Sequence, residues 1–261
     1  MAIPNDVLEY SIPAYFYPCE SNPMAKTLII AFTSHGGCGI HFEYVTPLKQ
    51  YDKAHVLFLS TCVRNGWYIN GGLNDTYPDL TQVMTNIIDP ILTAKSIQNV
   101  ITLGEGSGGT GAIYYGWELA KKVTTSILAF SPYNSIPADN WNLAVNICDT
   151  TPVASLAHKG NFKIFIDRTY QPEVDRIGQL GGKGFDVYEI EGHQHLSKSA
   201  YARGDLFRYL DVELNADDIQ DDRDYGIISS DKYASDRLVC HQEEIDNGTC
   251  NDILGNSDDD D

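Results

Sequence analysis

The feature that most constrains the fold is a regular alternation, between residues 27 and 195, of short apolar β-branched runs with amphipathic segments. The apolar runs are continuous, which is typical of strands covered on both faces. The expected strands are Thr27–Thr33, Ala54–Ser60, Asn99–Leu103, Ser126–Phe130, Lys163–Asp167 and Asp186–Glu191. The expected helices are Leu80–Ser96 with a kink at Pro90, Gly109–Lys122, Thr151–Lys159, Pro172–Leu180 and Leu196–Leu214. This order predicts an α/β fold, a three-layer sandwich whose mostly parallel sheet carries helices on both faces.

Charge is distributed unevenly and suggests a boundary near the C-terminus. Residues 211–261 hold 17 of the 36 acidic residues and 3 of the 18 Lys and Arg residues, a net charge of −14. The rest of the chain has a net charge of only −4. We therefore expect one domain at 1–214 and an acidic C-terminal extension at 215–261, partly disordered or peripheral. About thirty residues separate Phe130 from Lys163, too few for a large lid domain.

The overall charge and the apolar patterning exclude several classes of protein. A net charge of −18 disfavours nucleic acid as a partner, because phosphate binding needs a basic surface. The longest apolar runs are strand-sized, well short of the roughly 20 residues that a membrane span requires. The first residues, MAIPNDV, lack the basic and apolar regions of a signal peptide. We expect a protein that is cytoplasmic, or exported or assembled by a non-classical route, without a membrane.

The cysteines indicate a reducing compartment, and the spacing of possible metal ligands gives no sign of a cofactor. Four are scattered through the expected core elements without a C-x-x-C pair, namely Cys19, Cys38, Cys62 and Cys148. Cys240 and Cys250 are close enough for a local bridge, although free thiols are the usual state in the cytosol. His193 and His195 could share a metal with Asp167, but no further ligand has suitable spacing, so we expect no metal and no cofactor.

Ligands of open parallel sheets gather where the strands end, so the residues that follow each strand are the candidates for function. These residues are SHGGCG at 34–39, Thr61-Cys62, GEGSGG at 104–109, Ser131-Pro132-Tyr133, the segment from Arg168 to Asp175, and GHQH at 192–195. They include two glycine-rich loops, an acidic segment and a histidine pair, in that order.

The segment 101–116, ITLGEGSGGTGAIYYG, resembles the strand–elbow–helix of the α/β-hydrolase superfamily. In that elbow the residues two before and two after the nucleophile must be small. A nucleophile at position 106 has Gly104 and Gly108 as flanks, whereas Ser107 as nucleophile would have Glu105 at a pinched position. The resemblance therefore implies a degenerate elbow with Gly106, which has no side chain, at the nucleophile position.

The resemblance also implies the other parts of the site. The oxyanion donors are expected to be the amides of Gly36, Gly37 and Ser107. The acid is expected at Asp175, with Asp167 as the alternative, and the histidine at His193 in preference to His195. The stretch VRNGWYINGG at 63–72 is similar to a segment of a polysaccharide-associated branch of the superfamily.

Two functions from different classes follow from these residues. In the first, the chain has lost serine-hydrolase chemistry and serves a binding, scaffolding or assembly role. In the second, Ser107 attacks from a distorted elbow as an active esterase or acyl hydrolase, with His193 as base and Asp175 as its orienting acid. A third interpretation has His193 activate water directly. The expected partners are a small-molecule, glycan or acyl ligand, a protein, or further copies of the chain in an assembly.

Overall fold

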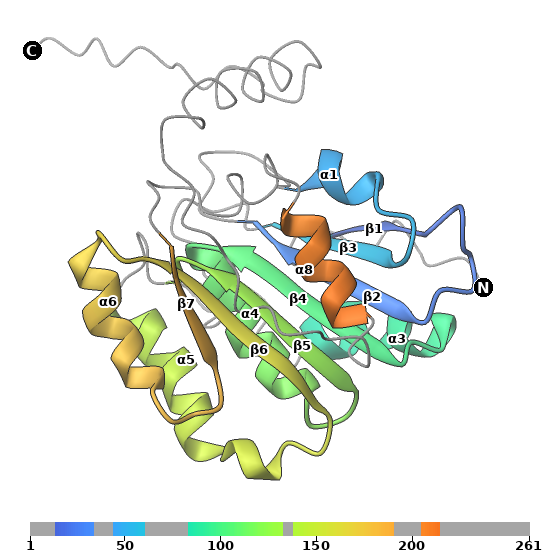
Figure 1. Cartoon of the computed structure of the whole chain (residues 1–261). Coiled ribbons are helices and arrows are strands. Elements are labelled where there is room, and N and C mark those ends of the chain that lie inside the picture. The colour runs from blue at the N-terminus through green and yellow to red at the C-terminus, as the bar shows by residue number, and fades with distance from the viewer. Residues whose placement is uncertain (1–13, 34–43, 61–82, 133–137, 191–204, 215–261) are drawn as a thin grey trace, which may run out of the picture.

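The computed structural model describes residues 14–33, 44–60, 83–132, 138–190 and 205–214. These residues form a seven-stranded sheet with helices on both faces (Figure 1). The strands are β1 (Ala14–Tyr17), β2 (Thr27–Phe32), β3 (His55–Leu59), β4 (Asn99–Glu105), β5 (Thr124–Phe130), β6 (Lys159–Asp167) and β7 (Asp186–Ile190). The α-helices are α1 (Val45–Lys49), α3 (Asp89–Lys95), α4 (Ser107–Leu119), α5 (Ala138–Thr150), α6 (Gln171–Ile177) and α8 (Asp205–Leu214).

The order of the strands locates the point where ligands of such folds bind. The sheet runs β1-β3-β2-β4-β5-β6-β7, with β1 antiparallel to β3 and every other neighbouring pair parallel. The chain passes outward from β2 to β3 and then crosses back to form β4 on the other side of β2. Ligands of open α/β sheets bind at the carboxyl ends of the strands where the order reverses in this way. The turn from β4 into α4 lies at this point.

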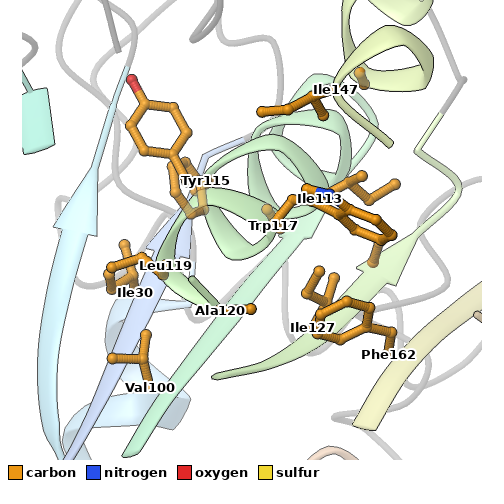
Figure 2. Close-up of a cluster of buried hydrophobic side chains, with 14 of the residues drawn as sticks. Ile30, Val100, Ile113, Tyr115, Trp117, Leu119, Ala120, Ile127, Ile147 and Phe162 are labelled. Carbon is orange, nitrogen blue, oxygen red and sulfur yellow. The ribbon is translucent and has the colours of Figure 1, made fainter. Parts of the chain in front are cut away.

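Each face of the sheet has its own hydrophobic core. On one face, Trp117 and Leu119 of α4 pack with Ile30, Ile127 and Phe162 of the strands (Figure 2). On the other face, Leu48 of α1 and Leu206 and Leu210 of α8 pack with strand residues that point the opposite way, among them Ile29, Val56 and Phe165. Full burial of a large apolar side chain contributes about 1.5–3 kcal/mol, so the two cores hold the sheet rigidly between its helices.

Small residues bring α4 unusually close to the sheet. A Cβ atom at Gly116 would lie 2.6 Å from both Ile127 Cγ1 and Thr102 Oγ1. The Thr102 hydroxyl donates a hydrogen bond to the Ala112 carbonyl of α4 at 2.9 Å. The helix is therefore fixed to β4 and β5 by contacts along its length, and its first turn has little freedom to move.

All six predicted strands are present, but one predicted helix is wrong. Residues 151–159 do not form the expected helix: Pro152 is extended, Val153–Ser155 form a short 3₁₀ turn, and β6 begins at Lys159. The helix of this region is α5, which ends at Thr150. Proline disfavours the α conformation of the residue before it, so the helix ends before Pro152.

Three smaller differences concern the other helices and the first strand. A π-helical turn at Met84–Ile88 leads into α3, and Pro90 lies in the first turn of α3. The helix α6 is followed by a 3₁₀ turn at Gly178–Leu180, where the predicted helix ends. The strand β1 was not predicted. Of the helix predicted at 196–214, only residues 205–214 are described, and they are helical.

The described residues also bear on the expectations about thiols and membranes. Cys19 and Cys148 are free and buried, and burial raises the pKa of the Cys148 thiol to about 12, which keeps it protonated. The other four cysteines lie outside the described residues. Within the described ranges, no helix has both the length and the hydropathy of a membrane span.

Candidate functional site

The connection between β4 and α4 is a sharp bend with its tip at Gly106. Gly106 has φ 56° and ψ −124°, a backbone conformation that residues with a Cβ atom adopt only under strain. Its N–H donates to the Phe130 carbonyl of β5 at 3.0 Å, and its carbonyl accepts the N–H of Thr110 at 3.1 Å. The tip is thus held from both sides, by the neighbouring strand and by the helix that follows it.

The residues two positions before and two positions after the tip, Gly104 and Gly108, have no room for side chains. A Cβ atom at Gly104 would lie 2.2 Å from the Gly108 carbonyl oxygen. A Cβ atom at Gly108 would lie 2.3 Å from the carbonyl oxygen of Phe32, the last residue of β2. Both distances are far below van der Waals contact, so only glycine fits at these positions. The steric requirement of an elbow therefore applies at 104 and 108, two residues before and two residues after position 106.

The first turn of α4 presents buried polar groups with no partner in the described part of the chain. The first helical hydrogen bond is donated by Thr110, so the amides of Ser107, Gly108 and Gly109 have no partner among the described residues. Ser107, the first residue of this turn, is 5% exposed. These donors lie at the carboxyl edge of the sheet, where the fold places ligands.

A second buried hydroxyl, which the sequence did not single out, follows the neighbouring strand. Ser131 comes directly after β5, is 3% exposed, and has a φ of 42°, in the left-handed region. Its N–H donates to the Phe165 carbonyl at 2.7 Å. The sequence indicated only that Ser131 follows a strand; its positive φ depends on contacts that no local pattern predicts.

The two candidate acids occupy different surroundings. Asp167 ends β6 and is 8% exposed; its Oδ1 accepts the N–H of Thr169 at 2.8 Å and the hydroxyl of Thr169 at 2.7 Å. Asp175 lies on α6, is exposed, and accepts the side-chain amide of Gln171 at 2.6 Å. Asp167 therefore lies at the carboxyl edge of the sheet, and Asp175 lies on the solvent side of a helix.

Two further buried carboxyl groups lie near these strand ends. Glu105 is the last residue of β4 and is 5% exposed. Glu173, on the first turn of α6, is 1% exposed and accepts the N–H of Asp167 at 3.2 Å. In the sequence, Glu105 stands out only as a poor flank for Ser107, and nothing marks Glu173 as a candidate. A single acidic residue in a first helical turn is too common to indicate burial.

The remaining candidates, His193, His195, Gly36 and Gly37, lie outside the described residues. The structure therefore does not relate Ser107 to either histidine, or the elbow to the expected oxyanion loop. Among the residues that it describes, no group of three or more His, Cys, Asp or Glu side chains is arranged to hold a metal ion.

Comparisons with known proteins concern the fold. No protein-family profile matches the sequence, and no curated protein sequence matches it. Among solved structures, it is similar to FphF, a substrate-bound fluorophosphonate-binding serine hydrolase of Staphylococcus aureus. The TM-score is 0.51 at 16% identity, over 73% of this chain and 84% of FphF. It is also similar to Est1E of Butyrivibrio proteoclasticus, with a TM-score of 0.48 at 13% identity, over 76% of this chain and 93% of Est1E. The chain has the α/β-hydrolase fold, as the sequence predicted.

Proposed function

We propose that this α/β-hydrolase-fold chain binds a ligand at the carboxyl edge of its sheet without serine-hydrolase chemistry. The observation that carries the proposal is Gly106 at the tip of the bend, between two glycines that admit no side chain. A nucleophile of this fold projects from the tip of the elbow. Glycine offers no atom for attack, so the covalent step has no starting point at this position.

The elbow keeps the features that serve binding. The Gly106 N–H and carbonyl are both hydrogen-bonded, and the amides that follow remain without partners among the described residues. Backbone donors of this kind stabilise the carbonyl oxygen of a bound ligand whether or not a nucleophile is present. Donors and binding without a nucleophile give only weak residual catalysis. A binding, scaffolding or assembly role fits this arrangement.

The experiment is labelling with a fluorophosphonate probe, detected by intact-protein mass spectrometry. We expect no adduct on the native chain and the same result for Ser107→Ala. FphF, which is named for binding such probes, serves as the positive control. A stoichiometric adduct on the native chain that disappears in Ser107→Ala would overturn the proposal.

The alternative is an active esterase or acyl hydrolase that uses Ser107, with His193 as base and Asp175 as its orienting acid. One observation favours it: Ser107 is buried directly after the tip of the bend. A serine at the first position of a helix, one residue past the tip, lies at a different angle to the sheet from an elbow nucleophile. The labelling experiment separates the two functions.

A further inference from the structure

We propose that residues 217–224, an acidic segment just after α8, bind to a basic and aromatic surface formed by β1, α1 and the turn that follows α1 in the same chain. This lysine–tyrosine surface consists of Tyr15, Tyr17, Lys49, Tyr51 and Lys53. The inference goes beyond the proposed function, because β1 is separated from β4 and the elbow by two strands of the sheet.

Lys49 is held over two tyrosine rings of the edge strand. Its Nζ lies 5.5 Å from the ring centroid of Tyr15 and 5.2 Å from that of Tyr17. These tyrosines are two residues apart on β1, so both rings project from the same face of the sheet. Lys49 is exposed, and an ammonium group that lies over aromatic rings keeps N–H donors for a carboxylate.

A second exposed lysine lies over the next tyrosine of this surface. Lys53 Nζ is 5.9 Å from the ring centroid of Tyr51. Residues 44–54 contain two lysines and one acid, Asp52, a net charge of +1, whereas the whole chain has a net charge of −18. The surface is therefore locally basic on a strongly acidic protein, and it favours an acidic segment as its occupant.

The end of α8 lies close to this surface. Phe207 of α8 stacks on Tyr51, with ring centroids 5.8 Å apart and an angle of 12° between the rings. Leu210 of α8 and Leu48 of α1 belong to the same hydrophobic core, and Figure 1 shows both helices on one side of the sheet. The helix ends at Leu214, which is about 10 Å from Phe207 along the helix axis at a rise of about 1.5 Å per residue.

The segment that follows α8 has the charge that this surface favours. Residues 217–224, DDIQDDRD, include five acids and one arginine, a net charge of −4. The segment begins three residues after Leu214, and an extended chain covers about 3.3–3.6 Å per residue, so it reaches the surface directly. A short connection also gives these acids a high effective concentration at the surface, whereas the acids at 258–261 are connected by a much longer chain.

The test is zero-length carbodiimide cross-linking of the full-length chain, followed by peptide mass spectrometry. This reagent joins a lysine to a carboxylate only when the two are in contact. We expect Lys49 or Lys53 to be joined to an acid of 217–224. The yield should fall about tenfold in about 1 M salt, where the Debye length is only about 3 Å. Mixing ¹⁴N-labelled and ¹⁵N-labelled chains distinguishes a link within one chain from a link between two copies.

The matched control for the lysines is Lys159. This residue is also exposed, and its Nζ lies 4.7 Å from the ring centroid of Phe162. Phe162 belongs to the core on the opposite face of the sheet from α8. We therefore expect no link between Lys159 and residues 217–224.

The acidic segment itself is tested with two variants that remove the same charge. The first combines Asp217→Asn, Asp218→Asn, Asp221→Asn and Asp222→Asn, and the control changes Asp258–Asp261 to Asn. The readout is the rate at which an N-hydroxysuccinimide ester of acetate acetylates Lys49, divided by the rate for Lys159. This ratio should rise about threefold in the first variant, as expected for the loss of a weak surface contact, and should not change in the control.

Four outcomes overturn the inference. They are the absence of a link from Lys49 or Lys53 to 217–224, an equal yield of links from Lys159, links that join two different chains, and equal acetylation ratios in the two variants. Surface ion pairs add little to stability, so the contact determines where the segment lies without a large effect on the Tm. None of these outcomes bears on the proposed function, which the fluorophosphonate experiment tests separately.

Discussion

The buried polar groups at the two edges of the sheet differ in how completely they are hydrogen-bonded. At the amino edge, the Cys19 N–H donates to His55 Nδ1 at 2.9 Å, and the Cys19 thiol donates to the Asp52 carbonyl at 3.1 Å. The Ser21 hydroxyl donates to the same Asp52 carbonyl, leaving His55 Nε2 as the one unpaired atom of this cluster within the described residues. At the carboxyl edge, the buried side chains of Glu105 and Glu173 each have one oxygen, Oε1, that accepts no hydrogen bond from the described residues.

The comparison separates buried polar groups that stabilise the fold from buried polar groups that do not. The amino-edge groups hydrogen-bond mostly to one another, so they stabilise the fold and leave little for a ligand. At the carboxyl edge, Glu105 Oε1 and Glu173 Oε1 are buried without a hydrogen bond from the described residues, and a buried polar atom in that state costs about 1–3 kcal/mol of stability. The predictions below test how much each edge contributes to stability.

The largest effect is expected at the elbow itself. Gly104→Ala places a Cβ atom 2.2 Å from a backbone oxygen. Because backbone cannot yield as a side chain can, we expect a loss of about 3 kcal/mol or more in the free energy of unfolding, measured by chemical denaturation. Gly178→Ala is the control, because a Cβ atom there meets nothing within 4 Å and the change should stay within about 0.5 kcal/mol. Equal stability of the two variants would contradict the pinched geometry.

The second prediction concerns the amino edge and pH. Burial, and then the positive charge of Lys95, hold the pKa of His55 below its usual value of 6.5. The unfolded chain therefore takes up a proton at His55 at a higher pH than the folded chain does, so stability is lost as the pH falls below 6.5 towards the lowered pKa. Protonation also places a hydrogen on the Nδ1 atom that accepts from Cys19.

The check is the free energy of unfolding measured between pH 7.5 and pH 5 for the native chain and for His55→Gln. The variant should be less stable at pH 7.5 and should lose less stability on acidification than the native chain. Parallel curves for the two proteins would show that His55 does not titrate as the structure implies.

The third prediction is the reverse effect at the carboxyl edge. Ser131→Gly should raise the free energy of unfolding by about 1 kcal/mol, because glycine adopts a φ of 42° without crowding. Thermal or chemical denaturation measures this directly. A loss of stability would mean that the Ser131 hydroxyl supports the fold, and the contrast between the two edges would fail.

The smallest effect is expected for removal of residues 215–261. Among the described residues, the two cores extend along the chain as far as Leu210, and residues 215–261 are strongly acidic, so we expect the Tm of a chain ending at residue 214 to differ from that of the full chain by less than about 3 °C. Differential scanning calorimetry gives the comparison. A large fall in Tm would show that the acidic segment packs against the body.

The sequence predicted the sheet well because buried parallel strands are continuous apolar runs. The sequence did not predict β1, because this strand has only four residues and lies at the edge of the sheet, with Tyr15 43% exposed. The sequence did not predict α5 either. The sequence of this helix, ADNWNLAVNICDT, is rich in Asn and Asp, which are weak helix formers. Its stability comes from tertiary packing of residues such as Trp141, which is fully buried.

The site was predicted less completely because its geometry depends on contacts between distant segments. The glycines at 104 and 108 indicated a pinched turn, since a short-range steric rule governs it. The burial of Glu173 and the left-handed backbone of Ser131 depend on β6, which is remote in the sequence from β5. Such features become visible only when the strands are assembled.

The central claim is tested most directly by a crystal structure that defines the distance from Ser107 Oγ to the nearest imidazole nitrogen of His193 or His195. The account predicts that this distance exceeds about 3.5 Å, outside hydrogen-bond reach. A distance of about 3 Å would place a working base beside a hydroxyl nucleophile, and the chain would then be a serine hydrolase.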